Sequence, residues 1–206
     1  MTPLVKVCGV TDASFAAEAA RMGVDYVGVI FAESSPRRVS VQRAREIAAA
    51  ARAAGNGRLR VVGVFVGQDA DEIASVAAEV PLDVVQLHGG YDEKSARRLR
   101  GLGLETWRLM SDGYFPDPAA WTADAVLLDG RSGGRTGGTG CLADWRQVAA
   151  LRRDGRRVVL AGGLSAENAS AAAGTLADVL DVNSGVETAP GEKSAGLLAG
   201  FLRAVR

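Results

Sequence analysis

Two residues that can transfer protons stand where apolar segments end. Cys8 closes the segment Leu4–Cys8, and Asp129 closes the segment Ala125–Asp129. A thiol becomes a base when a nearby cation or backbone donors lower its pKa. A carboxyl group in apolar surroundings has a raised pKa, which suits a general acid. The pair therefore predicts acid–base chemistry, with a buried structural cysteine and a loop-capping aspartate as the simpler alternatives.

Glycine and small polar residues follow the last two apolar segments of the chain. They are Gly162, Gly163, Asn183, Ser184 and Gly185. Glycine lets backbone N–H groups approach an anion closely, and barrel enzymes often hold phosphate with their last two loops. Either loop alone could be an ordinary tight turn. The two loops together predict a phosphate-binding site.

Four further polar side chains are candidate substrate contacts. They are Lys6, Arg37, Gln86 and His88. Lys6 precedes Cys8 by two residues and shares its face of the strand, so it is a candidate for the cation that activates the thiol or for a substrate contact. Arg37 could bind a carboxylate through two hydrogen bonds, and Arg38 could do so equally well on spacing alone. His88, the only histidine, is a structural hydrogen-bonding residue more often than a base at such a position.

Short runs rich in Val, Ile and Leu alternate with Ala-rich helical segments along the whole chain. The predicted strands are Leu4–Cys8, Tyr26–Phe31, Arg60–Val66, Val84–Leu87, Glu105–Leu109, Ala125–Asp129, Val158–Ala161 and Val179–Val182. Several are apolar on consecutive residues, which is typical of parallel strands buried on both faces. Repeated strand–helix units predict an α/β fold, a (β/α)8 TIM barrel in one domain over residues 1–206, with an open doubly wound sheet as the alternative. In such a barrel the carboxyl ends of the strands carry the active site.

Local signals predict where several helices begin and end. Ser40 and Asp69 are good N-caps for the helices that follow them. The final segment, 193–206, has helical spacing of its apolar residues. The stretch after the fifth strand contains Pro116 and Pro118, and we expect a short or irregular fifth helix there.

Composition excludes several classes of protein. The chain has 206 residues, 48% of them hydrophobic, with 24 Lys and Arg against 24 Asp and Glu. This balance offers no basic field for nucleic acid, and no apolar run approaches the roughly 18 residues that span a membrane. Neither a signal peptide nor a disulfide framework is evident, so a cytoplasmic location is expected. One histidine and no Cys/His cluster argue against a metal site.

The segment Gly133–Gly140 follows the sixth strand and is very rich in glycine. The simpler interpretation is a plain flexible loop. The functional interpretation is a lid that closes over the substrate, with Gly137 and Gly138 as candidate substrate contacts. Cys141 follows it, where a nucleotide-binding P-loop would have Lys and then Ser or Thr. The sequence therefore argues against nucleotide binding.

In this order the motifs resemble the phosphoribosylanthranilate isomerase family. The matching stretches are VKVCGVTD at 5–12, SPRRVS at 35–40, VGVFV at 62–66, VQLHG at 85–89, LLDG at 127–130, GGTG at 137–140, DW at 144–145, LAGGL at 160–164 and DVNSGVETAPG at 181–191. The resemblance implies an Amadori rearrangement of N-(5-phosphoribosyl)anthranilate to 1-(2-carboxyphenylamino)-1-deoxyribulose 5-phosphate in tryptophan biosynthesis. It implies that Asp129 protonates the ribose ring oxygen and that Cys8 takes the proton from C2. It further implies that Arg37 binds the anthranilate carboxylate and that the last two loops bind the phosphate. The resemblance thus implies a small-molecule substrate and no metal or redox cofactor.

Other functions stay open at this point. Directly after the glycine-rich segment, Cys141 and Ala143 replace the Lys and Phe that are usual in the family. Another phosphosugar aldose–ketose isomerase of the same barrel is the main alternative, although the histidine-pathway enzyme uses two aspartates and this chain has Cys8. A paralogue of altered specificity on the same barrel ranks with this alternative, and a non-catalytic barrel that binds a phosphorylated ligand ranks lower. The sequence does not distinguish a monomer from a homodimer.

Overall fold

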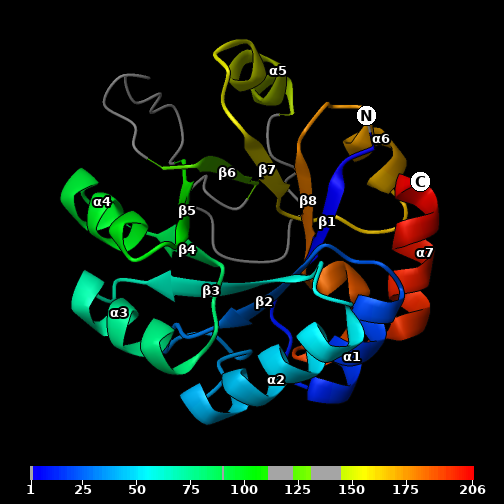
Figure 1. Ribbon diagram of the computed structural model, residues 1–206. Coiled ribbons are helices and arrows are strands. Elements are labelled where there is room, and N and C mark those ends of the chain that lie inside the picture. Colours follow the sequence, from blue (N-terminus) through cyan, green and yellow to red (C-terminus); the bar gives the residue numbers. More distant parts are fainter. Residues whose placement is uncertain (1, 90, 111–122, 131–144) are drawn as a thin grey trace.

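Eight parallel strands close into a barrel in the computed structural model, which describes residues 2–89, 91–110, 123–130 and 145–206 (Figure 1). The strands are β1 (Leu4–Val7), β2 (Tyr26–Ile30), β3 (Arg60–Val66), β4 (Val84–His88), β5 (Glu105–Leu109), β6 (Ala125–Asp129), β7 (Val158–Ala161) and β8 (Val179–Val182). They follow one another around the barrel in chain order, and β8 pairs with β1. The predicted TIM barrel is confirmed, and each predicted strand agrees with an observed one to within one residue at either end.

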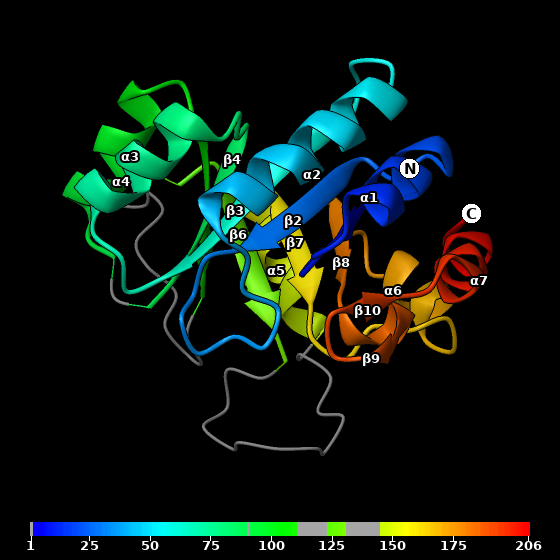
Figure 2. The same ribbon diagram turned by 90° about the horizontal axis from the view of Figure 1, so that it is seen from below.

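The described helices pack around the outside of the barrel (Figures 1 and 2). They are α1 (Ala13–Arg21), α2 (Val41–Ala54), α3 (Ala70–Glu79), α4 (Glu93–Gly101), α5 (Arg146–Arg153), α6 (Ala169–Ala173) and α7 (Ala195–Val205). The side chains of Ser40 and Asp69 cap α2 and α3, as predicted. The predicted irregular fifth helix falls largely on residues 111–122, and the glycine-rich lid falls on 131–144. Both lie outside the described residues.

After β8 the chain forms secondary structure that the spacing of its apolar residues does not predict. A short helix, η1 (Ser184–Val186), leads into a hairpin of β9 (Glu187–Ala189) and β10 (Glu192–Lys193). The last helix begins only at Ala195, because the Ser194 side chain accepts a hydrogen bond from the backbone N–H of Leu197. The expected helix over 193–206 is therefore two residues too long at its start, and Lys193 belongs to the hairpin.

Apolar side chains fill both sides of the barrel wall, as the consecutive apolar runs predict. The buried cluster inside the barrel includes Cys8, Tyr26, Ile30, Val62, Val64, Val84, Trp107, Leu127, Val159 and Val179. A larger cluster lies between the strands and the surrounding helices. Inside the barrel this leaves one fully buried cation, Lys6, among the described residues.

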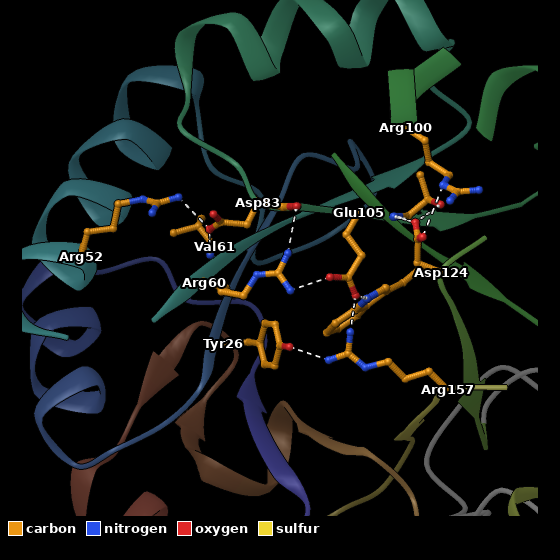
Figure 3. A network of polar contacts seen from close by, with 11 residues as sticks. Tyr26, Arg52, Arg60, Val61, Asp83, Arg100, Glu105, Asp124 and Arg157 are labelled. Atoms are coloured by element: carbon orange, nitrogen blue, oxygen red, sulfur yellow. Dashed lines mark hydrogen bonds and ion pairs between the residues drawn. The ribbon is translucent and has the colours of Figure 1, made fainter. Parts of the chain in front are cut away.

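At the amino-terminal end of the barrel an aspartate precedes every second strand. Asp25, Asp83, Asp124 and Asp178 each accept a hydrogen bond from a backbone N–H of the preceding strand, at 2.7–2.8 Å. Arginines on α2, α4 and α5 pair with the last three of these carboxylates. Figure 3 shows two of these pairs, Arg52 with Asp83 and Arg100 with Asp124. The repeated aspartate ties each even-numbered strand to its odd-numbered neighbour.

Glu105 fills the same end of the barrel. Its carboxylate accepts hydrogen bonds from Arg60 and Arg157, each at 2.5 Å, and Arg157 also donates to the hydroxyl of Tyr26 (Figure 3). The Tyr26 ring packs edge-on against Trp107 at 5.0 Å. These contacts occupy the amino-terminal end, so a substrate site is expected at the opposite end.

Replacing Asp83 by Ala should destabilise the protein by about 2 kcal/mol, because the Val61 N–H and the Arg52 guanidinium lose their acceptor. Urea denaturation measures this change. Asp71→Ala is the matched control: Asp71 pairs with Arg98 at the surface, and its removal should cost less than about 1 kcal/mol. Equal losses in the two variants would show that the aspartate at the strand start has no special role.

Candidate active site

A pocket opens at the carboxyl ends of the strands, where the sequence places its candidate residues. Among the predicted site residues, its lining includes Cys8, Gln86, His88, Asp129, Gly162, Gly163, Asn183 and Ser184. These residues come from β4 and β6 and from the segments that follow β1, β7 and β8. Three predicted residues lie beside this lining: Lys6, Arg37 and Gly185. Gly137 and Gly138 fall outside the described residues.

Cys8 follows β1 directly, and only 5% of it is exposed. Its backbone N–H donates to the carbonyl of Val182 at 2.9 Å, which holds the end of β1 against β8. Burial raises the pKa of the Cys8 thiol above its ordinary value, while the neighbouring Lys6 acts in the opposite direction. The influence of burial is the larger, so the lowered pKa expected of a basic thiol is not found, and Lys6 offsets only part of the effect of burial.

Lys6 lies inside the barrel, fully buried. Its ammonium donates to Asp181 Oδ2 at 2.6 Å and to Gln86 Oε1 at 2.9 Å. Burial alone would lower the pKa of Lys6, but the Asp181 carboxylate and Cys8 raise it above its ordinary value. The predicted contact of Lys6 with substrate stays a prediction, because in this structure its donors are directed to other side chains of the barrel.

Gln86 links this ammonium to His88. Lys6 can only donate, so the Gln86 amide oxygen faces it and the amide nitrogen faces His88 Nε2, at 2.7 Å. His88 therefore accepts at Nε2 and carries its proton at Nδ1. Burial, followed by the positive charge of Lys6, lowers the pKa of His88 to about 4. A pKa of about 4 makes the imidazole a weak base, and its Nε2 already accepts from Gln86, so a hydrogen-bonding role is favoured over that of a general base.

Asp129 ends β6 on the side of the pocket where the β7 loop passes closely. Gly162 there has a φ of +85°, and a Cβ atom on it would lie 2.3 Å from the Gly130 nitrogen and 2.6 Å from Asp129 Oδ1. Glycine is therefore required at position 162 for the packing around Asp129 as well as for any approach of an anion.

The predicted phosphate loops pack against one another, backbone to backbone. A Cβ atom on Gly185 would lie 2.0 Å from the carbonyl oxygen of Leu164. Gly163, Asn183 and Ser184 line the pocket beside this contact. Gly185 thus holds the two loops together, and the binding of a phosphate by these loops stays a prediction.

Arg37 is held by a residue that the sequence did not single out. Its Nε and Nη2 groups donate to the two oxygens of Glu187, at 2.8 and 2.6 Å. Burial opposes the ionisation of Glu187, but hydrogen bonds from Arg37 and Lys193 lower its pKa to about 2. Arg38, the alternative carboxylate ligand, is half exposed and faces Glu33 at 3.5 Å. Which of the two arginines binds a carboxylate of the substrate stays a prediction.

Lys193 links Glu187, the partner of Arg37, to Asn183 in the loop after β8. Its buried ammonium donates to Glu187 Oε1 at 2.7 Å and to the carbonyl and side-chain oxygens of Asn183 at 3.0 and 2.8 Å. Sequence reasoning missed this residue because a two-residue strand has no periodicity. It also passed over Asp181 and Glu187, although Asp181 alternates with Asn183 along β8, a spacing that could have indicated it.

Among the residues described here, no group of His, Cys, Asp or Glu could hold a metal ion, and no helix is long and apolar enough to cross a membrane.

Comparisons with known proteins agree with this geometry. The family model described as N-(5'-phosphoribosyl)anthranilate (PRA) isomerase matches residues 5–204. An N-(5'-phosphoribosyl)anthranilate isomerase of Rubrobacter xylanophilus is 42% identical over 207 residues, which cover 98% of each chain. The crystal structure of phosphoribosyl anthranilate isomerase from Thermus thermophilus superposes with a TM-score of 0.84 at 33% identity, and covers 98% of each chain. A phosphoribosyl anthranilate isomerase in complex with reduced 1-(o-carboxyphenylamino)-1-deoxyribulose 5-phosphate superposes with a TM-score of 0.82 at 28% identity, again over 98% of each chain.

Fold and pocket together define an enzyme of the TIM-barrel class whose site lies at the carboxyl ends of its strands. The chain belongs to the phosphoribosylanthranilate isomerase family, the isomerases of tryptophan biosynthesis. The resemblance seen in the sequence motifs is thereby confirmed.

Proposed function

We propose that this enzyme converts N-(5-phosphoribosyl)anthranilate to 1-(2-carboxyphenylamino)-1-deoxyribulose 5-phosphate, with Asp129 as general acid and Cys8 as general base. One observation carries the proposal: Cys8 and Asp129 line the same pocket from strands that are not neighbours in the barrel. A ring-opening isomerisation needs a proton donor and a proton acceptor at different atoms of the sugar. Groups on β1 and β6 can approach a bound sugar from different sides.

In the first step, the protonated Asp129 carboxyl gives its proton to the ribose ring oxygen. The bond between C1 and this oxygen breaks, and the nitrogen lone pair forms the C1=N bond of an iminium ion. In the second step, the Cys8 thiolate takes the proton from C2, so an S–H bond forms. The electron pair of the C2–H bond becomes a C1=C2 double bond and neutralises the iminium. The resulting enol then tautomerises to the ketone of the product.

The loops after β7 and β8 supply the expected phosphate contacts. Gly163, Asn183 and Ser184 line the pocket at these loops. Backbone N–H groups there can donate to phosphate oxygens without competition from bulky side chains. Anchoring the phosphate at this side would present C1 and C2 of the sugar to Cys8 and Asp129.

Arg37 is the proposed ligand of the anthranilate carboxylate. Glu187 fixes two of its donor groups, and its Nη1 has no hydrogen-bond partner within the described residues. We expect Arg37→Ala to raise KM by about 10- to 100-fold and to lower kcat less, because a charge-assisted hydrogen bond contributes about 1.5–3 kcal/mol. Steady-state kinetics measure both constants. Arg38→Ala is the matched control and should change KM less than about twofold; the reverse ranking would move the carboxylate contact to Arg38.

Complementation of a tryptophan auxotroph that lacks this isomerase tests the proposed function in a cell. Growth on medium without tryptophan is expected. A folded protein that fails to support growth, but turns over a different phosphorylated aminoaldose, would favour the alternative of another isomerase on the same barrel. A cytoplasmic location is part of the proposal and follows from the pathway.

A further inference from the structure

A buried pair of opposite charges lies next to Cys8, and the steps above give it no part. The Lys6 ammonium and Asp181 Oδ2 are 2.6 Å apart, and their side chains are 0% and 5% exposed. Ion pairs buried to this degree are costly to desolvate and add little stability. Their presence in the barrel interior therefore favours a functional role.

The strands β1 and β8 place the side chains of Lys6, Cys8 and Asp181 next to one another. Lys6 and Cys8 point to the same face of the chain, two residues apart. Lys6 is the register partner of Asp181 across β1 and β8. On the other neighbouring strand, Gly28 leaves the space that both β1 side chains use, since a Cβ atom there would lie 3.1 Å from Cys8 Sγ and from Lys6 Cε. The ammonium is thus confined next to the thiol.

Only one of the two carboxylate oxygens of Asp181 has a hydrogen-bond partner among the described residues. Its Oδ2 binds Lys6, while its buried Oδ1 has no hydrogen-bond partner in the part of the chain that the structure describes. A carboxylate that served only to neutralise Lys6 would be expected to have both oxygens bonded. Its negative charge instead remains close enough to act on Cys8.

We propose that Lys6 and Asp181 are a pair of positioning residues that sets how readily the Cys8 thiol loses its proton. Asp181 and Gln86 fix the Lys6 ammonium, and the ammonium stabilises the Cys8 thiolate. The Asp181 carboxylate repels the same thiolate, so the two charges act on Cys8 with opposite signs. This inference rests on the proposed function, because that function makes Cys8 the base.

Other charged groups near Cys8 do not have this arrangement. Arg37, from the loop after β2, and Lys193, on β10, also act on the thiol, but both bind the single carboxylate of Glu187. His88 on β4 is neutral at pH 7, and Asp129 on β6 faces the same pocket. Removal of the Lys6 charge should therefore raise the pKa of the Cys8 thiol, and removal of the Asp181 charge should lower it.

The test is the rate at which iodoacetamide alkylates Cys8, measured against pH in the full-length protein. Every variant carries Cys141→Ser, so that Cys8 is the only thiol. At pH 7, Lys6→Met should slow alkylation by about tenfold and Asp181→Asn should speed it by about tenfold, which corresponds to about 1.4 kcal/mol in each direction. Lys94→Met and Asp71→Asn, at exposed positions far along the chain from this pair, are matched controls and should leave the rate unchanged.

A merely structural role predicts a different result, because loosened packing would expose Cys8 and speed alkylation in both variants. Shifts of the same sign, or no shifts, would overturn the proposal. If Lys6→Met does not fold, the pH dependence in Asp181→Asn, which keeps the shape of the side chain, decides. The proposal lowers the pH midpoint of alkylation and leaves the rate of the fully ionised thiol unchanged, whereas loosened packing raises the rate at every pH. Alkylation needs no substrate: opposite shifts in a protein without isomerase activity would refute the proposed function and leave the coupling in place. In an active enzyme, the pH at which kcat/KM rises as Cys8 ionises should be higher in Lys6→Met and lower in Asp181→Asn than in the wild type.

Discussion

Asp129→Asn is expected to lower kcat by about 10³- to 10⁴-fold, at the upper end of what general acids contribute. The amide has nearly the same shape as the carboxyl group but cannot give a proton to the ribose ring oxygen. Affinity for the product should stay within a few-fold of the wild type, because the proposed contacts of phosphate and anthranilate lie on other residues. Steady-state kinetics and titration with the product measure the two effects separately.

The matched control for this variant is Asp71→Asn, an exposed aspartate on α3. It should leave kcat unchanged. If Asp129→Asn kept a kcat near that of the wild type, ring opening would require another acid, and the assignment of Asp129 would be wrong.

Cys8→Ser is expected to lower kcat by about 10³-fold or more. A serine hydroxyl fills nearly the same volume but does not ionise near neutral pH, so no base remains to take the C2 proton. Stability should change little, because the substitution replaces one small side chain at the pocket wall. The kinetic comparison is made with Cys141→Ser, which should keep full activity.

Deuterium at C2 of the substrate separates two explanations for the loss in Cys8→Ser. Loss of the base makes proton abstraction rate-limiting, so the residual reaction should be slower with deuterium than with hydrogen at C2. The same residual rate with both isotopes would indicate that Cys8 serves another step.

The barrel could be predicted from the sequence because its strands are buried on both faces. Val158–Ala161 and Val179–Val182 are apolar at nearly every position, and such runs have few alternatives in an α/β chain. The ends of the eight predicted strands then indicated Cys8, Asp129 and the predicted phosphate loops. For these residues, position along a strand was sufficient to predict that they line one pocket.

The partners of the polar residues could not be predicted in the same way. Lys6 was expected to act on Cys8 or on the substrate, but its strongest contact, Asp181, is 175 residues away in sequence. Glu187 and Lys193 lie in a hairpin of two very short strands, where neither periodicity nor composition gives a signal. Such contacts depend on the register with which β8 closes the barrel against β1.

Gly162 shows a further limit of prediction from the sequence. Its type and place predicted an approach to phosphate, and this stays a prediction. The geometry gives it a second role, because its missing Cβ leaves room for Asp129 and the Gly130 backbone. One residue type can satisfy two demands, and only the three-dimensional packing separates them.

The most direct measurement is the rate of 1-(2-carboxyphenylamino)-1-deoxyribulose 5-phosphate formation by the purified protein supplied with N-(5-phosphoribosyl)anthranilate. We predict a kcat/KM of about 10⁴ M⁻¹s⁻¹ or more for the wild type, within the usual range for enzymes, and near-background rates for Cys8→Ser and Asp129→Asn. Product formation at the uncatalysed rate by the folded wild-type protein would contradict the proposed function. Undiminished rates in both variants would contradict the proposed acid and base.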